Sequence, residues 1–329
     1  MCIRDRTNIK AIRSAASRLK GYVRETPILT SPFLDEIAGK NIYVKAESLQ
    51  HTGSFKFRGG WSAISEMSEK KRKNGVLAIS SGNHAQGVAN AARAFNTKSV
   101  IIMPEDAPSL KIANTRKLGA EVILYDRLNQ NREELGAQIA KDRELTLIKP
   151  YDEPLVIAGQ GTCGLELAKQ CKGLHISKAD VIVCCGGGGL TAGIALALEQ
   201  EAPEFTVRTA EPEQFNDVAK SLEAGKICRN HSMSGSICDA ILTPEPGEIT
   251  FPIMKKLCGK GFTVSDEECM RAIYLAFIRL KLVLEPGGAA ALAAALFHSN
   301  KIDCENVIIV ATGGNIDKET FTKALTNYN

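Results

Sequence analysis

The sequence lacks several features that would place the chain in a specialised class of protein. Its 329 residues contain no Cys-x-x-Cys pair and no apolar stretch long enough to span a membrane. Charge of one sign is not in excess either, because 41 Lys and Arg stand against 37 Asp and Glu, a net charge of +4. The basic residues are spread along the chain, so nucleic-acid binding has little support. We therefore expect neither a membrane protein nor a nucleic-acid-binding protein.

The cysteines and the first residues bear on where the protein is expected to reside. Ten cysteines are scattered along the chain, and the adjacent Cys184 and Cys185 do not easily form a structural disulfide or a zinc pair. Scattered reduced thiols favour the cytoplasm. Residues 1–6 are charged, lack the apolar centre of a signal peptide and fit poorly with the helix expected after them.

Strand and helix patterns alternate along most of the chain. A helix is expected over residues 57–68, and strands and helices then alternate from residue 75 to residue 148, with one of these helices over 132–142. The pattern restarts after residue 154, with a helix over 156–170, an apolar strand over 181–185 and a later helix over 266–281. Such alternation is typical of βαβ units around a parallel sheet. We predict an α/β protein of two lobes, with parallel sheets flanked by helices and a ligand cleft between the lobes.

Lys56 lies in an unusual setting, since residues 54–60 are Ser-Phe-Lys-Phe-Arg-Gly-Gly. Two phenylalanines beside the lysine partly exclude water, and desolvation lowers the pKa of an amine. A neutral amine is a nucleophile that forms a Schiff base with an aldehyde. The same segment also fits a lysine at a helix start whose stem lies on apolar neighbours while its head is in water. The segment alone does not decide between these interpretations.

A run of four glycines follows the apolar strand and opens a helix: Gly186, Gly187, Gly188 and Gly189. Backbone N–H groups in such a run, together with the helix start, suit a phosphate, although a tight turn without a ligand is the plainer alternative. No Gly-Lys-[Ser/Thr] follows, which disfavours a nucleoside triphosphate. A dinucleotide fold is a rival, because a variant of its fingerprint fits here and Glu211 ends the next strand.

Two further segments carry polar groups to strand ends. Residues 80–84, Ser-Ser-Gly-Asn-His, lie between a strand and a helix and offer hydroxyls, an amide and free N–H groups suited to a carboxylate. Ser81 or Asn83 capping that helix is the alternative. Thr312 ends the last strand, where its hydroxyl faces the cleft or caps a turn.

In this order the motifs resemble the fold-type II pyridoxal-phosphate enzymes, in particular the serine/threonine dehydratase and serine racemase family. The resemblance extends from about residue 26 to residue 317 and rests on residues 54–60, 80–84, 157–162, 186–190, 285–288 and 312–315. It implies a fold like that of the tryptophan synthase β subunit, with the cofactor between the lobes. The large domain is expected over 1–50 and 150–329 and the small domain over 51–149, without the regulatory domain of longer relatives.

The resemblance implies a role for each matching residue. Lys56 would bind the cofactor as a Schiff base and later take the Cα proton of the substrate. Phe55 would pack near the cofactor ring, Asn83 would bond the ring hydroxyl, and Thr312, where relatives more often have serine, would face the pyridine nitrogen. The glycine run would hold the phosphate. The substrate carboxylate would be bound by Ser80, Ser81, Asn83 and His84.

The resemblance also suggests a divalent cation. In the racemase branch, acids at the positions of Glu211 and Asp217 and a backbone carbonyl near Phe215 help to bind one. Oxygen ligands of this kind suit Mg²⁺ or Ca²⁺. Two solvated acids after a strand are the alternative. Glu285 is expected near the pyridine edge or, alternatively, in a turn.

The predicted activity is that of a homodimeric ammonia-lyase that converts L-threonine and L-serine to a 2-oxo acid and ammonia. A neutral hydroxyl at Thr312 favours loss of a β-leaving group over transamination. Serine racemase is one alternative, with Ser81 as a second acid/base. Dehydration of 3-hydroxyaspartate is another, with Arg132 at the second carboxylate, although a surface residue is the preferred interpretation of Arg132. A dinucleotide-binding oxidoreductase is the distant alternative.

Overall fold

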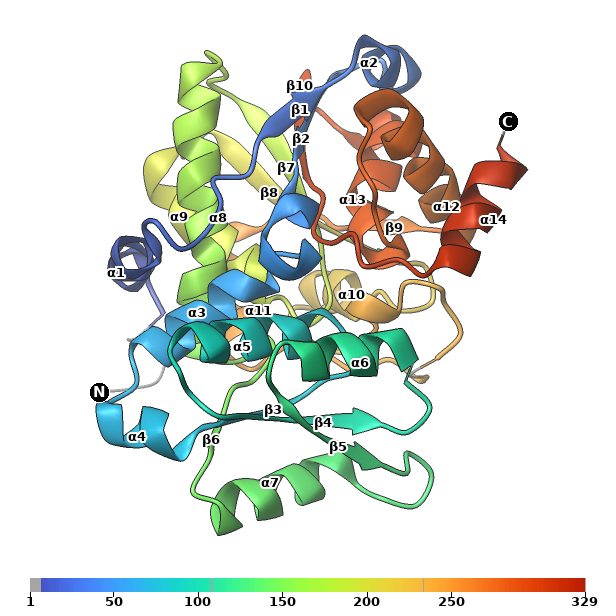
Figure 1. Ribbon diagram of the computed structural model, residues 1–329. Coiled ribbons are helices and arrows are strands. Elements are labelled where there is room, and N and C mark those ends of the chain that lie inside the picture. The colour runs from blue at the N-terminus through green and yellow to red at the C-terminus, as the bar shows by residue number, and fades with distance from the viewer. Residues whose placement is uncertain (1–6, 108, 233, 329) are drawn as a thin grey trace.

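The computed structural model describes residues 7–107, 109–232 and 234–328, which form two sheets flanked by helices (Figure 1). The six-stranded sheet has the order β1-β2-β10-β7-β8-β9, and the four-stranded sheet has the order β5-β4-β3-β6. All neighbouring strands are parallel except β1 and β2. The strands are β1 Ile28–Thr30, β2 Asn41–Lys45, β3 Val76–Ile79, β4 Ser99–Pro104, β5 Glu121–Tyr125, β6 Thr146–Leu147, β7 Ala179–Cys184, β8 Phe205–Pro212, β9 Phe262–Val264 and β10 Asn306–Val310.

The helices cover both faces of each sheet. In the four-stranded sheet, α5 and α6 lie on one face and α7 on the other, while α13 and α9 pack on opposite faces of the six-stranded sheet (Figure 1). The predicted α/β arrangement of parallel sheets flanked by helices is confirmed. The helices are α1 Ile9–Leu19, α2 Pro32–Ala38, α3 Lys56–Ser65, α4 Glu69–Asn74, α5 Asn83–Ala94, α6 Ser109–Lys117, α7 Arg132–Asp142, α8 Pro154–Gly173, α9 Gly189–Glu201, α10 Asp217–Ala224, α11 Thr250–Leu257, α12 Asp266–Leu275, α13 Pro286–Phe297 and α14 Lys318–Asn327.

Two predicted helices end earlier than the sequence pattern suggested. The helix expected over 57–68 ends at Ser65, and α4 begins anew behind Ser68, whose hydroxyl accepts a hydrogen bond from the Lys71 N–H at its start. The helix expected over 266–281 is α-helical only to Leu275 and continues as a π-helix, Ala276–Leu280. A side-chain cap and a change of helical pitch therefore divide segments that hydrophobic periodicity joined.

The core of the larger sheet depends on a helix of small residues. Nearly all of α13 is buried, and its run from Ala289 to Ala295 is fully excluded from solvent. Small side chains allow the helix to approach the sheet closely on one side and α12 on the other. Gly288 lies so near the backbone of Gly313 that an added Cβ would overlap it. The start of α13 is thus held against the turn after β10.

A group of charged side chains is buried between α3 and α8, and we call Lys45, Glu47, Arg58 and Glu166 the buried ion cluster. Arg58 donates two hydrogen bonds to Glu47 and two to Glu166, at 2.7–2.8 Å. Lys45 Nζ donates to Glu166 Oε2 at 2.9 Å. Burial alone would lower the pKa of Arg58, but its two carboxylate partners hold that pKa well above its usual value. The cluster thereby fixes the first turn of α3, two residues beyond Lys56.

The described residues also bear on membrane spans and disulfides. Within the described residues, no helix is long and apolar enough to cross a membrane. The cysteines at 163, 171, 184, 185, 228, 238, 258, 269 and 304 are all free thiols, as expected for scattered reduced cysteines.

Candidate active site

One cavity of about 230 Å³ brings together most of the residues that the motifs singled out. It opens between the two sheets, where the starts of α3, α5, α9 and α13 meet. The predicted residues that line it are Phe55, Lys56, Ser80, Ser81, Asn83, His84, Gly186, Gly187, Gly188, Gly189, Glu285 and Thr312. The sequence therefore predicted a single site from segments more than 250 positions apart.

Lys56 is the first residue of α3, and its amine faces this cavity. The Nζ atom donates to the Pro150 carbonyl at 2.9 Å and lies 5.1 Å from the centroid of the Phe55 ring. Burial lowers the pKa of Lys56 to about 8, and the negative charge of Glu285 partly offsets that effect. The interpretation of Lys56 as a solvated helix-start lysine is wrong, because its head contacts a backbone carbonyl within the cavity.

The Lys56 segment is tied directly to the turn that holds Thr312. Ser54 and Gly313 form an antiparallel bridge, and the Phe55 N–H donates to the Thr312 carbonyl at 3.2 Å. Thr312 itself is only 4% exposed and lies on the cavity wall. These backbone contacts fix the position of the amine relative to the threonine hydroxyl.

The glycine run forms the turn from β7 into α9. Gly188 has a left-handed backbone with φ 89°, and an added Cβ on Gly187 would overlap the ring of Tyr151. The Gly187 carbonyl accepts from Thr250 Oγ1 at 2.6 Å, so the loop is anchored from behind. Free N–H groups at the start of α9 then face the cavity, which suits an anion. The sequence missed Tyr151, although it follows the last strand of the smaller sheet.

Residues 80–84 connect β3 to α5 at the cavity wall. The N-cap position of α5 is Gly82, and no side chain caps the helix, so capping by Ser81 or Asn83 is wrong. His84 Nε2 bonds the Ile148 carbonyl at 2.8 Å, and burial, with Lys56 nearby, lowers the pKa of His84 to about 3. This imidazole is therefore neutral. The uncapped N–H groups at the helix start remain available for an anionic ligand.

Asn83 makes two side-chain hydrogen bonds that the motifs did not predict. Its Nδ2 donates to Glu285 Oε1 at 2.5 Å, and its Oδ1 accepts from Asn315 Nδ2 at 2.7 Å. Burial raises the pKa of Glu285 to about 7, against the hydrogen bond from Asn83. Glu285 therefore lines the cavity and is not only a turn residue. Asn315 had a signal in the sequence, because it ends the Thr-Gly-Gly-Asn motif.

Two cationic side chains also line the cavity. Arg132 begins α7 and is half exposed, and its Nε lies 3.2 Å from Glu133 Oε1. Lys111 lies on α6, and its Nζ is 3.1 Å from Asp239 Oδ2 of the opposite wall. Arg132 is thus partly exposed, as the preferred interpretation held, but it faces the cavity as well. Lys111 and Asp239 lie in none of the sequence motifs, so no signal in the sequence indicated that they line the cavity.

The three residues predicted to bind a cation lie outside this cavity. Glu211, Phe215 and Asp217 are each no more than 1% exposed, so the alternative of two solvated acids is wrong. Glu211 accepts hydrogen bonds from the backbone N–H groups of Val218 and Ala219 at 2.9 and 2.8 Å. Its carboxylate is thus bound by backbone N–H groups and does not line the cavity, which disfavours a role as the ribose-binding acid of a dinucleotide fold.

Burial disfavours the charged form of both acids. Burial and the nearby Asp217 raise the pKa of Glu211, and burial raises the pKa of Asp217 to about 7. Asp217 Oδ1 accepts from Asn230 Nδ2 at 2.6 Å, but its Oδ2 is buried without a hydrogen bond. The described residues hold no group of three or more His, Cys, Asp or Glu side chains arranged for a metal ion.

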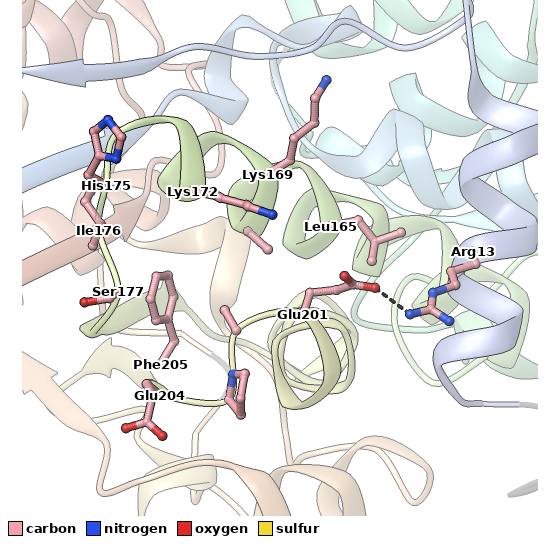
Figure 2. A pocket seen from close by; sticks show the side chains of 13 residues that line it. Arg13, Leu165, Lys169, Lys172, His175, Ile176, Ser177, Glu201, Glu204 and Phe205 are labelled. Atoms are coloured by element: carbon pink, nitrogen blue, oxygen red, sulfur yellow. Dashed lines mark hydrogen bonds and ion pairs between the residues drawn. The ribbon is translucent and has the colours of Figure 1, made fainter.

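A larger groove of about 850 Å³ lies on the outer surface, between α1, α8 and α9 (Figure 2). Its labelled side chains include charged as well as apolar ones, and Arg13 forms an ion pair with Glu201 at 2.7 Å across it. None of the predicted site residues lines this groove. The smaller cavity is therefore the candidate active site.

The chain is similar to known proteins over most of its length. Residues 19–313 match the family model described as pyridoxal-phosphate dependent enzyme. The chain is 41% identical over 311 residues to L-threo-3-hydroxyaspartate ammonia-lyase of a Pseudomonas species, covering 94% of this chain and 96% of the relative. It is 39% identical to serine racemase of Schizosaccharomyces pombe, covering 95% and 96%.

Solved structures agree with the sequence matches. The crystal structure of a T.th. threonine deaminase superposes with a TM-score of 0.88 at 42% identity, covering 94% of this chain and 99% of the other. The predicted fold is therefore confirmed, and the dinucleotide-binding oxidoreductase is set aside because the family model includes the glycine run. The chain belongs to the pyridoxal-phosphate-dependent enzymes, in the fold-type II group that includes threonine deaminase and serine racemase.

Proposed function

We propose that the protein is a pyridoxal-phosphate-dependent ammonia-lyase acting on 3-hydroxy-2-amino acids. The observation that carries this proposal is the Lys56 amine, which faces the same cavity as the glycine run, residues 186–189, here called the glycine cradle. Its pKa of about 8 leaves the amine partly neutral at neutral pH. The names of the ammonia-lyase relatives support the reaction type. Lys56→Ala is expected to abolish both the visible absorption of the bound cofactor and ammonia release. Retention of both in the purified variant would refute the assignment.

The cavity fits the cofactor group by group. Residues 186–189 would hold the phosphate, because glycines let the backbone approach a ligand closely and no side chain caps the N–H groups at the start of α9. Phe55 would pack near the ring, Asn83 would donate to its hydroxyl, and Thr312 would face its nitrogen. When bound, pyridoxal phosphate supplies an electron sink for negative charge at the substrate Cα.

The chain's own residues then bind the substrate and move protons. Lys56 Nζ takes the Cα proton, and its lowered pKa allows the amine to act as a base near neutral pH. The helix start at Asn83, together with Ser80, Ser81 and the N–H of His84, binds the carboxylate. The neutral hydroxyl of Thr312 does not hold a proton on the ring nitrogen as an acid would, which favours loss of the β-hydroxyl over transamination.

L-Threonine and L-serine are the substrates that the motifs predict, and 3-hydroxyaspartate is a second candidate. Arg132 on the cavity wall favours the latter, because a guanidinium binds a second carboxylate well. For Arg132→Ala we expect KM for L-threo-3-hydroxyaspartate to rise at least about tenfold while KM for L-serine stays unchanged. Arg143→Ala, an exposed arginine of the same region paired with Glu121, is the matched control. Equal effects on both substrates would contradict an Arg132 carboxylate contact.

Racemisation is the alternative that Ser81 supports, since this hydroxyl lines the same cavity as Lys56. Racemisation requires a second acid/base, and a serine in that role would reprotonate Cα. Chiral analysis of serine recovered from reactions of the wild type and Ser81→Ala separates the two activities. D-Serine formed by the wild type and lost in the variant supports a racemase, whereas its absence from both supports a lyase.

We also propose that Glu211, Asp217 and the backbone carbonyl near Phe215 hold Mg²⁺ or Ca²⁺. Two buried carboxylates with raised pKa values, one of them with an unbonded oxygen, fit a hard cation. Either ion is expected to raise the unfolding temperature of the wild type, and a chelator to lower it. Asp217→Asn should remove this dependence. A wild-type unfolding temperature that changes with neither ion would refute the site.

Finally, we propose a cytoplasmic homodimer. Apolar side chains on α2 and near the π-helix are exposed, including Phe33 at 52% and Phe277 at 37%, which supports a protein contact there. The free cysteines support a reducing compartment. Sedimentation equilibrium gives the mass in solution, and a monomer at micromolar concentration would contradict the dimer.

A further inference from the structure

The Asn83 amide is held from two sides by side chains of distant segments. Asn83 begins α5, Glu285 precedes α13, and Asn315 follows β10. The hydrogen bonds, Asn83 Nδ2 to Glu285 Oε1 and Asn315 Nδ2 to Asn83 Oδ1, join residues 202 and 232 positions apart in the sequence. We call Asn83, Glu285 and Asn315 the Asn83 clamp. It links α5, which covers the smaller sheet, to the start of α13 and the turn after β10, which belong to the larger sheet.

A backbone carbonyl fixes the direction of every hydrogen bond in the Asn83 clamp. Asn315 Nδ2 also donates to the Thr52 carbonyl at 2.8 Å, and a carbonyl oxygen can only accept. The Asn315 nitrogen must therefore face both Thr52 and Asn83, so Asn83 presents its oxygen to Asn315 and its nitrogen to Glu285. Glu285 uses one N–H of that nitrogen. The second N–H remains for a ligand in the cavity.

Two features indicate that the Asn83 clamp serves the site and not the local fold. Glu285 is the N-cap residue of α13, yet its side chain makes no capping hydrogen bond to that helix. Glycines also make room for the clamp. An added Cβ on Gly313 would overlap Glu285, and one on Gly53 would lie 2.7 Å from the side-chain oxygen of Asn315. If residue 285 served only the stability of α13, its side chain would be expected to accept a hydrogen bond from the first N–H groups of that helix.

We infer that Glu285 and Asn315 are positioning residues that aim the second N–H of Asn83 at the ring oxygen of pyridoxal phosphate. The inference rests on the proposed function, in which Asn83 contacts that ring. An amide already fixed in one orientation loses little freedom when the cofactor binds, which strengthens binding. A hydrogen bond to the ring oxygen also favours its deprotonated form, because the donor stabilises the charged state.

The test compares apoenzyme variants by cofactor affinity and by the spectrum of the bound cofactor. Asn315→Ala is expected to raise the dissociation constant of pyridoxal phosphate roughly tenfold, the effect of weakening one hydrogen bond to a charged oxygen. It should also shift absorbance from the visible to the near-ultraviolet band, since the ring oxygen is then more often protonated. Asn41→Ala is the control and should change neither, because Asn41 is the exposed first residue of β2 and bonds Asn306 far from the cavity lining.

A double-mutant cycle separates positioning from a general structural effect. If Asn315 acts through Asn83, the double variant Asn83→Ala/Asn315→Ala binds the cofactor as Asn83→Ala alone does. Glu285→Gln keeps an acceptor for the Asn83 nitrogen and should retain the wild-type affinity and spectrum, whereas Glu285→Ala should lose both. Equal losses in Glu285→Gln and Glu285→Ala would instead assign the effect to the charge of Glu285.

Additive effects in the double variant, or a wild-type affinity and spectrum in Asn315→Ala, would overturn the inference. Thermal unfolding of each apoenzyme shows whether a variant is folded. Should Asn315→Ala not fold, Asn315→Asp has nearly the same size without the donor and carries the same expectation. A wild-type chain that binds no pyridoxal phosphate would refute the proposed function instead, so the two failures are distinguishable.

Discussion

The lowered pKa of Lys56 makes a quantitative prediction about attachment of the cofactor. Only the neutral amine attacks an aldehyde, so the rate of attachment follows the neutral fraction of Lys56. Lowering the pKa from 10.5 to about 8 raises that fraction at pH 7 from about 0.03% to about 9%, roughly 300-fold. The rate should therefore rise about tenfold per pH unit below pH 8 and become constant above it.

The measurement is the appearance of visible absorbance after apoenzyme is mixed with pyridoxal phosphate between pH 6 and pH 10. The same pH series with N-acetyl-lysine corrects for titration of the aldehyde itself. Glu285→Gln provides an internal check, because removal of the negative charge that raises the pKa of Lys56 should move the midpoint to lower pH. A wild-type rate that still rises about tenfold per pH unit up to pH 10, as for an amine with a pKa of 10.5, would refute the argument that burial of Lys56 prepares it for reaction.

The other predictions concern stability and the glycine cradle. Arg58→Leu leaves charges of the buried ion cluster unpaired and should cost about 3–5 kcal/mol in urea unfolding, against roughly 0–1 kcal/mol for Arg13→Leu, whose ion pair is exposed. In α8, Gly159→Ala places a Cβ against the backbone of α3 and should lower the free energy of unfolding by about 1–3 kcal/mol. Gly173→Ala meets open space and should raise it by up to about 1 kcal/mol. Equal changes in the two variants would contradict the packing argument. Gly187→Ala should raise the cofactor dissociation constant more than about tenfold without unfolding the protein, and an unchanged constant would count against the phosphate cradle.

Local signals in the sequence were sufficient for much of the fold and for the location of the site. Apolar strands followed by glycines or small polar residues predicted the turns at residues 80–84 and 186–189, because in each sheet ligands bind beyond the carboxyl ends of parallel strands. The helix over α7 was predicted with its observed bounds, since Asn131 caps it through two backbone N–H groups. The break between α3 and α4 was missed, although Ser68 is an ordinary N-cap residue.

The domain boundaries stay a prediction, and α3 shows why the sequence does not settle them. This helix packs against α5 over the smaller sheet and against α8 beside the larger one. Its sequence has apolar and glycine positions suited to both contacts, so periodicity assigns it to neither domain. Limited proteolysis around residues 50 and 150 tests the boundaries.

The residue types and their order along the chain determined that a lysine, a glycine cradle and an anion-binding helix start belong to one enzyme family. Only the tertiary structure decided how these groups are arranged and charged. The pKa of Lys56 depends on the enclosure formed by both sheets, and the orientation of Asn83 depends on Glu285, 202 positions away. Hydrogen bonds and desolvation act over a few ångströms in space, so side chains distant in the sequence set the chemistry of a site that local motifs only locate.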